Sequence, residues 1–213
     1  TGEIMKVLKE NGMKENTIIV FSSDNGPVYD DGYDDGTTVK TSTQEVQSGH
    51  DGSGPYRGGK YQIYEGGTRV PFIIRWPAKI KAGMKSDAMV NQIDFVHSFA
   101  KFLEVDLAAK EAIDSRDMWK TFIGESKEGL PYMLEEARGL ALRKGSWKYI
   151  PGMTRTKRLK DGTKKQVKGK AELYNLANDI GEQKNVATQY PEVVKAMDQK
   201  LNDLKDPKGI RNK

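Results

Sequence analysis

An aspartate and an asparagine stand side by side directly after a short apolar run. Residues 17–21 are rich in β-branched side chains and predict a buried strand, and Asp24-Asn25-Gly26 follows it closely. Hard cations such as Ca²⁺ take oxygen ligands from carboxylates and amide carbonyls, so Asp24 and Asn25 could converge on one ion. The same residues are common in turns, because Asn and Gly tolerate positive φ. Taken alone, they favour a turn.

Four segments in a fixed order change this interpretation. They are Asp24-Asn25-Gly26-Pro27, Arg57-Gly58-Gly59-Lys60, Glu65-Gly66-Gly67-Thr68-Arg69-Val70-Pro71 and Trp76-Pro77. In this order they resemble the sulfatases, specifically the arylsulfatase-like branch of the alkaline phosphatase superfamily. The resemblance extends from the first helix, residues 2–12, to Glu172-Leu173-Tyr174-Asn175-Leu176 and the acidic segment that ends at Glu182.

The resemblance implies hydrolysis of a sulfate ester by a formylglycine nucleophile and a bound Ca²⁺, with Mg²⁺ as the alternative ion. It implies that Asp24 and Asn25 are the second half of the metal shell, and that Lys60 is a catalytic and substrate-binding residue that contacts the sulfate oxygens. A cation and an ammonium at a sulfuryl group would stabilise the charge that develops in the transition state. The formylglycine and the other metal carboxylates are expected upstream, outside this chain, so we expect the chain alone to be inactive.

Two further residues have weaker claims to a role in the site. His50 lies in the loop before Lys60, where an imidazole could bind substrate or protonate a leaving alkoxide. Ser53 begins a Ser-x-Pro-x-Arg segment that resembles the site of formylglycine formation. Its context is wrong, because it belongs to the Gly-Pro-x-Arg-Gly-Gly-Lys segment, and we expect Ser53 to be a loop residue.

The chain of 213 residues has a net charge of +5, and much of this charge lies in one stretch. Residues 154–170 contain eight Lys or Arg and a single acid, Asp161, in an Asp-Gly pair typical of a hairpin turn. This stretch predicts a solvated hairpin, and its functional alternative is a patch for polyanions such as sulfated glycans. No aromatic residue is interleaved for base stacking, so nucleic acid is a poor fit.

The elements predict an α/β fold in two parts. Residues 1–130 would be the later part of an alkaline-phosphatase-like sulfatase core with the metal and sulfate residues, and residues 131–213 a small α+β subdomain with an antiparallel sheet and a C-terminal helix. A second buried strand is expected at 70–75. The helices are expected at 2–11, at 94–104 with Ile93, Val96, Ala100 and Leu103 on its apolar face, and from Pro191 onward with Val194, Met197, Leu201 and Leu204 buried.

We therefore interpret the chain as a carboxyl-terminal fragment of a sulfatase that needs the rest of its core. Its partner would be a sulfated small molecule or glycan, and the resemblance implies a periplasmic or secreted protein, although no signal peptide is visible. No apolar run is long enough to span a bilayer. Two alternatives remain open: a related phosphodiesterase or phosphonate hydrolase, in which His would often replace Asn25, and a non-catalytic polyanion-binding module.

Overall fold

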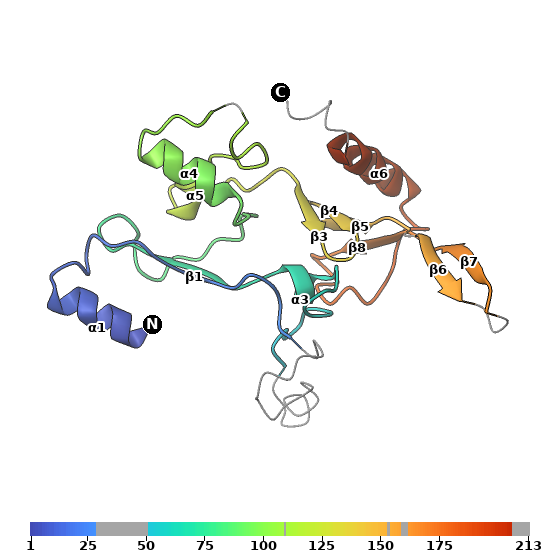
Figure 1. The fold of residues 1–213 in the computed structure, drawn as a ribbon, viewed down its shortest axis with the longest axis horizontal. Coiled ribbons are helices and arrows are strands. Elements are labelled where there is room, and N and C mark those ends of the chain that lie inside the picture. Colours follow the sequence, from blue (N-terminus) through green and yellow to red (C-terminus); the bar gives the residue numbers. More distant parts are fainter. Residues whose placement is uncertain (29–50, 109, 153, 159–161, 206–213) are drawn as a thin grey trace. The chain divides into compact units, whose positions relative to one another are not determined.

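The computed structural model describes most of the chain as two compact units (Figure 1). The first unit comprises residues 1–23 and 71–131, and the second comprises residues 24–70 and 132–213. The described residues are 1–28, 51–108, 110–152, 154–158 and 162–205. Residues 24–70 thus belong to the same unit as the C-terminal residues, whereas the division at residue 130 predicted from the sequence stays a prediction.

The first unit contains an antiparallel strand pair beside its N-terminal helix. Helix α1 spans Gly2–Glu10, and strand β1 (Ile19–Ser22) pairs with β2 (Phe72–Arg75) so that Ile19 faces Arg75 and Ser22 faces Phe72. The prediction that these strands are buried is wrong for the described structure, because Phe21 is 50% and Ile73 61% exposed. A two-stranded pair with one face uncovered leaves such side chains open to solvent.

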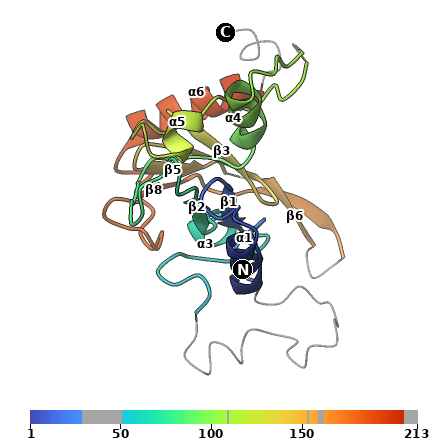
Figure 2. The ribbon, with the colours of Figure 1, turned by 90° about the vertical axis from the view of Figure 1, so that its left-hand side faces the viewer.

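Two helices of the first unit are held together by aromatic side chains. Helix α4 spans Asp94–Phe102 and α5 spans Trp119–Phe122 (Figure 2). Phe102 stacks on Trp119 with ring centroids 4.2 Å apart, and Phe95 contacts Phe122 at 4.9 Å. The prediction that Ile93, Val96 and Leu103 lie on the buried apolar face of α4 is wrong, since all three side chains are exposed. The buried residues of α4 are instead Asp94 and Ser98, and the half-buried ring of Phe95 packs against Phe122.

The second unit is built on a four-stranded antiparallel sheet in the order β3-β4-β5-β8. The strands are β3 (Met133–Glu136), β4 (Leu140–Lys144), β5 (Trp147–Ile150) and β8 (Glu172–Asn175). Helix α6 (Pro191–Lys205) packs Met197 and Leu201 against Leu142, Tyr149 and Leu173 on one face. The predicted start of this helix at Pro191 and the burial of Met197 and Leu201 are confirmed.

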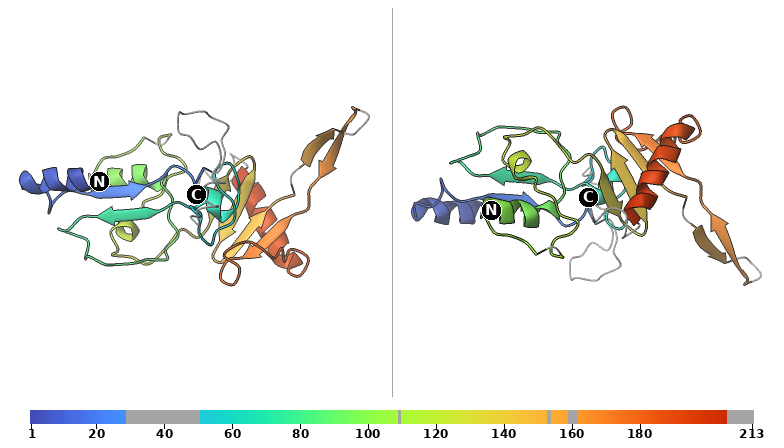
Figure 3. Two further views of the ribbon diagram at one scale, coloured as in Figure 1. Left: turned by 90° about the horizontal axis from the view of Figure 1, so that it is seen from below. Right: turned by 90° about the horizontal axis from the view of Figure 1, so that it is seen from above.

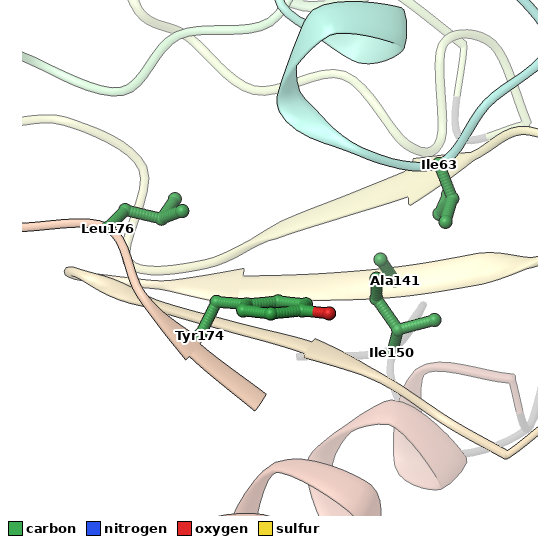
Figure 4. Packing of buried hydrophobic residues seen from close by; sticks show 5 residues of the cluster. All are labelled: Ile63, Ala141, Ile150, Tyr174 and Leu176. Carbon is green, nitrogen blue, oxygen red and sulfur yellow. The ribbon is translucent and has the colours of Figure 1, made fainter. Parts of the chain in front are cut away.

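The opposite face of the sheet carries the segment that leads into α3 (Glu65–Thr68). Ile63 packs there against Ala141, Ile150 and Tyr174 (Figure 4). The same sheet therefore has a helix on each side, α6 on one and the short α3 on the other, and α3 is the element that follows Lys60.

A second hairpin extends away from this sheet (Figure 3). Strand β6 (Thr154–Arg158) pairs with β7 (Lys164–Lys168), and Gly162 in the connection has a φ of +84°. The hairpin predicted around the Asp161-Gly162 pair is confirmed. With its helices and antiparallel sheets, the described chain is of mixed α and β structure, as predicted. None of the described helices is long and apolar enough to cross a membrane.

Candidate functional site

The residues predicted to bind metal and sulfate lie on two loops that are hydrogen-bonded to each other. The Lys60 backbone N–H donates to the carbonyl oxygen of Pro27 at 2.8 Å, close to Asn25 in the same turn. The first loop leaves β1 through Asp24, and the second precedes α3. The structure thus brings Lys60 next to the Asp24-Asn25 turn, although the two segments are well separated in the sequence.

Helix α3 holds both loops through its two glycines. Gly26 donates its N–H to the carbonyl of Gly67 at 3.0 Å, and the N–H of Gly66 donates to the carbonyl of Arg57 at 2.8 Å. A Cβ on Gly26 would overlap the carbonyl oxygen of Gly66, and a Cβ on Gly66 would overlap the carbonyl of Gly58. The glycines are therefore required because backbone approaches backbone directly at these positions.

Asp24 and Asn25 have donor atoms that suit a hard cation. Asp24 is exposed, and Asn25 is partly buried with its Nδ2 donating to the carbonyl of Gly26 at 2.8 Å. Because the amide nitrogen bonds to backbone, the amide oxygen is the atom that could ligate an ion. Within the described ranges no three His, Cys, Asp or Glu side chains gather as a metal site. Since Ca²⁺ takes six to eight oxygens, these two residues fit only part of a shell.

Lys60 lies beside an aromatic ring that a second cationic side chain also contacts. Its Nζ is 5.1 Å from the ring centroid of Tyr61, and the guanidinium carbon of Arg138 is 5.2 Å from the same centroid. Tyr61 is 43% exposed and has a φ of +70°, and Arg138 has a φ of +49°. Non-glycine residues in the left-handed region are uncommon and are found preferentially at functional sites.

Sequence reasoning missed Tyr61 and Arg138. The Arg138-Gly139 pair between two apolar runs indicates a turn, but no local pattern says that this turn reaches the loop of Lys60. Of the other predicted residues, His50 lies outside the described residues. Ser53 is a buried loop residue whose hydroxyl donates to Asp51 Oδ1 at 2.9 Å.

Arg57 is directed into the protein and away from a substrate role. Its Nη1 donates to the carbonyl of Glu182 at 2.9 Å and to the Tyr174 hydroxyl at 3.2 Å, and its guanidinium lies 3.7 Å from the ring centroid of Tyr64. Arg57 therefore attaches the loop of Lys60 to the four-stranded sheet and to the segment after β8.

A buried ionic cluster lies beneath α3. Its centre is Lys148 of β5, whose Nζ is 2.7 Å from Glu135, 3.0 Å from Glu65 and 3.6 Å from Glu182. All four side chains are almost fully shielded from solvent. Arg143 and Arg69 each approach Glu65 Oε2 at 3.3 Å. We call the four residues Lys148, Glu65, Glu135 and Glu182 the Lys148 cluster.

The protonation of this cluster follows from burial and from its internal charges. Burial alone would raise the pKa of Glu65, but Lys148 and Arg143 lower it below the usual value. Burial would lower the pKa of Lys148, but the three carboxylates raise it. At the other two carboxyl groups burial outweighs the attraction of Lys148: it raises the pKa of Glu135, and it raises the pKa of Glu182 to about 7. Lys148 and Glu65 are thus charged at neutral pH, while Glu182 titrates there.

Comparison with known proteins places the chain among related sequences. The family model described as Sulfatase matches residues 1–105. The N-acetylgalactosamine-6-O-sulfatase of Bacteroides thetaiotaomicron is 40% identical over 211 residues, which are 96% of this chain and 39% of that protein. Human steryl-sulfatase is 34% identical over 126 residues, 59% of this chain and 20% of that protein.

A solved structure shows the same similarity in three dimensions. It was described in connection with the metabolism of multiple glycosaminoglycans by Bacteroides thetaiotaomicron, and it is 41% identical in sequence with a TM-score of 0.80. The match covers 95% of this chain and 42% of that chain. The chain thus spans about two fifths of the length of these two bacterial relatives.

Proposed function

We propose that this chain, which belongs to the sulfatase family, carries part of the active site of an enzyme that hydrolyses a sulfate ester. The observation that supports this most directly is the hydrogen bond from the Lys60 N–H to the carbonyl of Pro27. It joins the loop of the cationic residue to the turn with the two oxygen donors. A sulfate ester needs both, since charge develops on its oxygens as the ester bond breaks.

In this proposal Lys60 has one role, and Asp24 and Asn25 share another. Lys60 binds and orients the sulfuryl oxygens through its ammonium group, which is a compact point charge with three donors. Asp24 and Asn25 provide two ligands of a Ca²⁺ shell that is completed by residues outside the described ranges. When bound, the ion would add positive charge at the sulfuryl oxygens, and a formylglycine from elsewhere in the protein would supply the attacking oxygen.

We further propose that the substrate is a sulfated sugar of a glycan. The relative with 40% identity is named for N-acetylgalactosamine 6-O-sulfate chemistry. Tyr61 beside Lys60 offers an exposed ring on which a sugar can pack, and Arg138 next to the same ring has the planar fork that binds carboxylate or sulfate with two hydrogen bonds. This pair would bind the part of the substrate adjacent to the sulfate ester.

The experiment is to assay the full-length protein, produced with a formylglycine-forming enzyme, on three substrates. They are 6-O-sulfated N-acetylgalactosamine, 4-nitrophenyl sulfate and a phosphonate monoester. We expect turnover of at least one sulfate ester, preferentially the sugar. Turnover of the phosphonate alone would favour the related phosphonate hydrolases and contradict the assignment to sulfate. Fractionation of the source cells would test the proposed periplasmic or secreted location.

The basic hairpin supports a second function, the binding of a polyanion. The β6–β7 register places Arg158 opposite Lys164, next to Lys165. Like charges directly opposite each other destabilise a strand pair, and a two-stranded hairpin has little packing to offset this. A polyanionic chain would remove the repulsion, so we propose that the hairpin binds a sulfated glycan beyond the residue that is hydrolysed.

Salt elution from a chondroitin sulfate column tests this second function. Replacing Arg158, Lys164 and Lys165 by Gln should lower the salt concentration needed for elution. The matched control replaces Lys79, Lys81 and Lys85, three exposed lysines of the first unit, by Gln, and it should lower the eluting salt concentration less. An equal decrease in the two variants would mean that retention depends only on the net charge of the protein. Elution that depends instead on Asp24 and Lys60 would assign retention to the catalytic site.

A further inference from the structure

The Lys148 cluster is unusual because it buries an ammonium and three carboxyl groups where apolar side chains would serve stability as well. Transfer of ions from water is costly, and replacement of buried ionic groups by apolar residues is often neutral or stabilising. Lys148 is 0% exposed, and its partners on the two adjacent strands are Arg143 of β4 and Tyr174 of β8. The cluster therefore calls for an explanation other than stability.

Each carboxylate of the cluster also holds part of α3. Glu182 Oε2 accepts the backbone N–H of Glu65 at 2.7 Å, at the first residue of the helix. Glu135 Oε2 accepts the hydroxyl of Thr68 at 3.0 Å, at the last residue. The side chain of Glu65 is itself bonded to Lys148. The helix is thus fixed at both ends and through its side chain, and Lys148 contacts all three carboxylates that fix it.

The position of α3 in turn sets the position of the two loops of the site. Gly67 accepts the N–H of Gly26 and Gly66 donates to Arg57, so each loop is bonded to its own glycine of the helix. Arg57 is also bonded to the backbone of Glu182, a member of the cluster. A displacement of α3 would therefore move the Asp24-Asn25 turn and the loop of Lys60 together or separate them.

We infer that Lys148 is a positioning residue: through Glu65, Glu135 and Glu182 it fixes α3, and through α3 it fixes Lys60 relative to Asp24 and Asn25. This inference rests on the proposed sulfatase function for its catalytic consequence, but its geometric part does not. Lys148 touches neither substrate nor metal in this scheme. Misplacement of catalytic groups by about 1 Å can cost on the order of 10²-fold in rate, so a small shift of α3 suffices.

The variant Lys148→Met in the full-length protein tests the inference, with Tyr149→Phe as the matched control. Tyr149 is the next residue of β5 and lies on the opposite face, where its hydroxyl donates to Asp198 at 2.7 Å. Both variants lose a buried polar interaction of the same strand, but only Lys148 contacts the groups that hold α3. We expect Lys148→Met to lower kcat by roughly 10²-fold with a smaller change in KM, and Tyr149→Phe to leave kcat within about 2-fold.

A second variant keeps the test valid if Lys148→Met does not fold. Lys148→Met combined with Glu135→Gln removes one charge of each sign and keeps an acceptor for Thr68. All activities are measured at temperatures where each variant is folded, as judged by its Tm. The inference predicts a low kcat in whichever variant is folded. A folded variant with kcat within about 2-fold of the parent protein would overturn it and leave Lys148 a purely structural role.

Hydrogen exchange separates this inference from the proposed function. The amides of Gly26, Lys60 and Gly66 should exchange at least about 10-fold faster in the Lys148 variants and unchanged in Tyr149→Phe, since local opening of these bonds governs their exchange. If the parent protein has no sulfatase activity but these amides lose protection, the function is wrong and the positioning role stands. Unchanged exchange of the three amides would refute the positioning role whatever the activity.

Discussion

The backbone N–H of Gly26 donates to the carbonyl oxygen of Gly67 at 3.0 Å, which joins the turn after β1 to the short helix α3. The two residues belong to separate segments of the sequence, and neither has a side chain that could keep them apart. This contact links the predicted metal ligands to the helix that the Lys148 cluster holds. Variants near it should therefore affect the site before they affect the rest of the fold.

Gly26→Ala should disrupt the site severely. The new Cβ would overlap the carbonyl oxygen of Gly66, which is backbone and cannot turn aside, so the turn or α3 must move. We expect a loss of stability of roughly 1–3 kcal/mol, the usual cost of overpacking, and weaker Ca²⁺ binding. Gly2→Ala is the control, since a Cβ on Gly2 meets nothing within 4 Å. Thermal unfolding measures the stability of both variants, and equal stability of the two would contradict the close approach of Gly26 to the Gly66 carbonyl.

Lys60→Ala in the full-length protein should lower kcat for a sulfate ester by roughly 10² or more, the scale on which one preorganised transition-state contact acts. The Tm should stay nearly unchanged, because Lys60 is a partly exposed loop residue. Steady-state kinetics on 4-nitrophenyl sulfate measures the effect, with Lys79→Ala as an exposed lysine control. Unaltered kcat in Lys60→Ala would show that the role had been assigned to the wrong residue.

The chain by itself should bind Ca²⁺ weakly, because its described residues contribute one carboxylate and one amide as predicted ligands and affinity follows ligand number and charge. In the full-length protein, Asp24→Ala should weaken binding more than Asn25→Ala, since it removes a charge. Titration calorimetry on this chain and on the full-length protein measures the Ca²⁺ affinity, with Asp87→Ala as a control at an exposed carboxylate. Micromolar affinity of this chain alone, lost on Asp24→Ala, would mean that a complete site lies within it.

Stability should depend on pH through Glu182, whose pKa is raised to about 7 by burial. Between the ordinary value of 4.5 and about 7, the folded state binds this proton more tightly than the unfolded state does. Stability from this group is therefore full below pH 4.5 and is lost as the pH rises to about 7. Because Glu182→Gln cannot ionise, it should raise the Tm at pH 8 by roughly 3 °C and change it little near pH 4.5.

The control for this prediction is Glu136→Gln, since Glu136 is an exposed carboxylate of β3. It should leave the pH dependence of Tm as it is in the parent protein. Thermal unfolding between about pH 4.5 and 8 gives the comparison. A Glu182→Gln variant that is less stable at pH 8 than the parent would mean that the ionised carboxylate is stabilising and that folding lowers the pKa of Glu182 instead of raising it.

Local signals in the sequence determined the turns, several elements and the family. Asp161-Gly162 predicted a hairpin because such pairs adopt positive φ readily, and Pro191 predicted the start of α6 because its φ suits a first helical turn. Asp24, Asn25 and Lys60 were identified as candidates because several short glycine-containing motifs, in their order, resemble those of the sulfatases. These features depend on residues close together in the chain, and so they can be read without the fold.

Only the tertiary structure determined which side chains are buried together. In Trp147-Lys148-Tyr149-Ile150 the alternation of a strand would place Lys148 on a solvent face. It is instead fully buried, because carboxyl groups from α3, from β3 and from the segment after β8 surround its ammonium group. Glu182 bonds to the backbone of Glu65 across 117 residues. No local pattern encodes such a pairing, because the energy that favours it exists only after the sheet, α3 and the segment after β8 have excluded water from the same place.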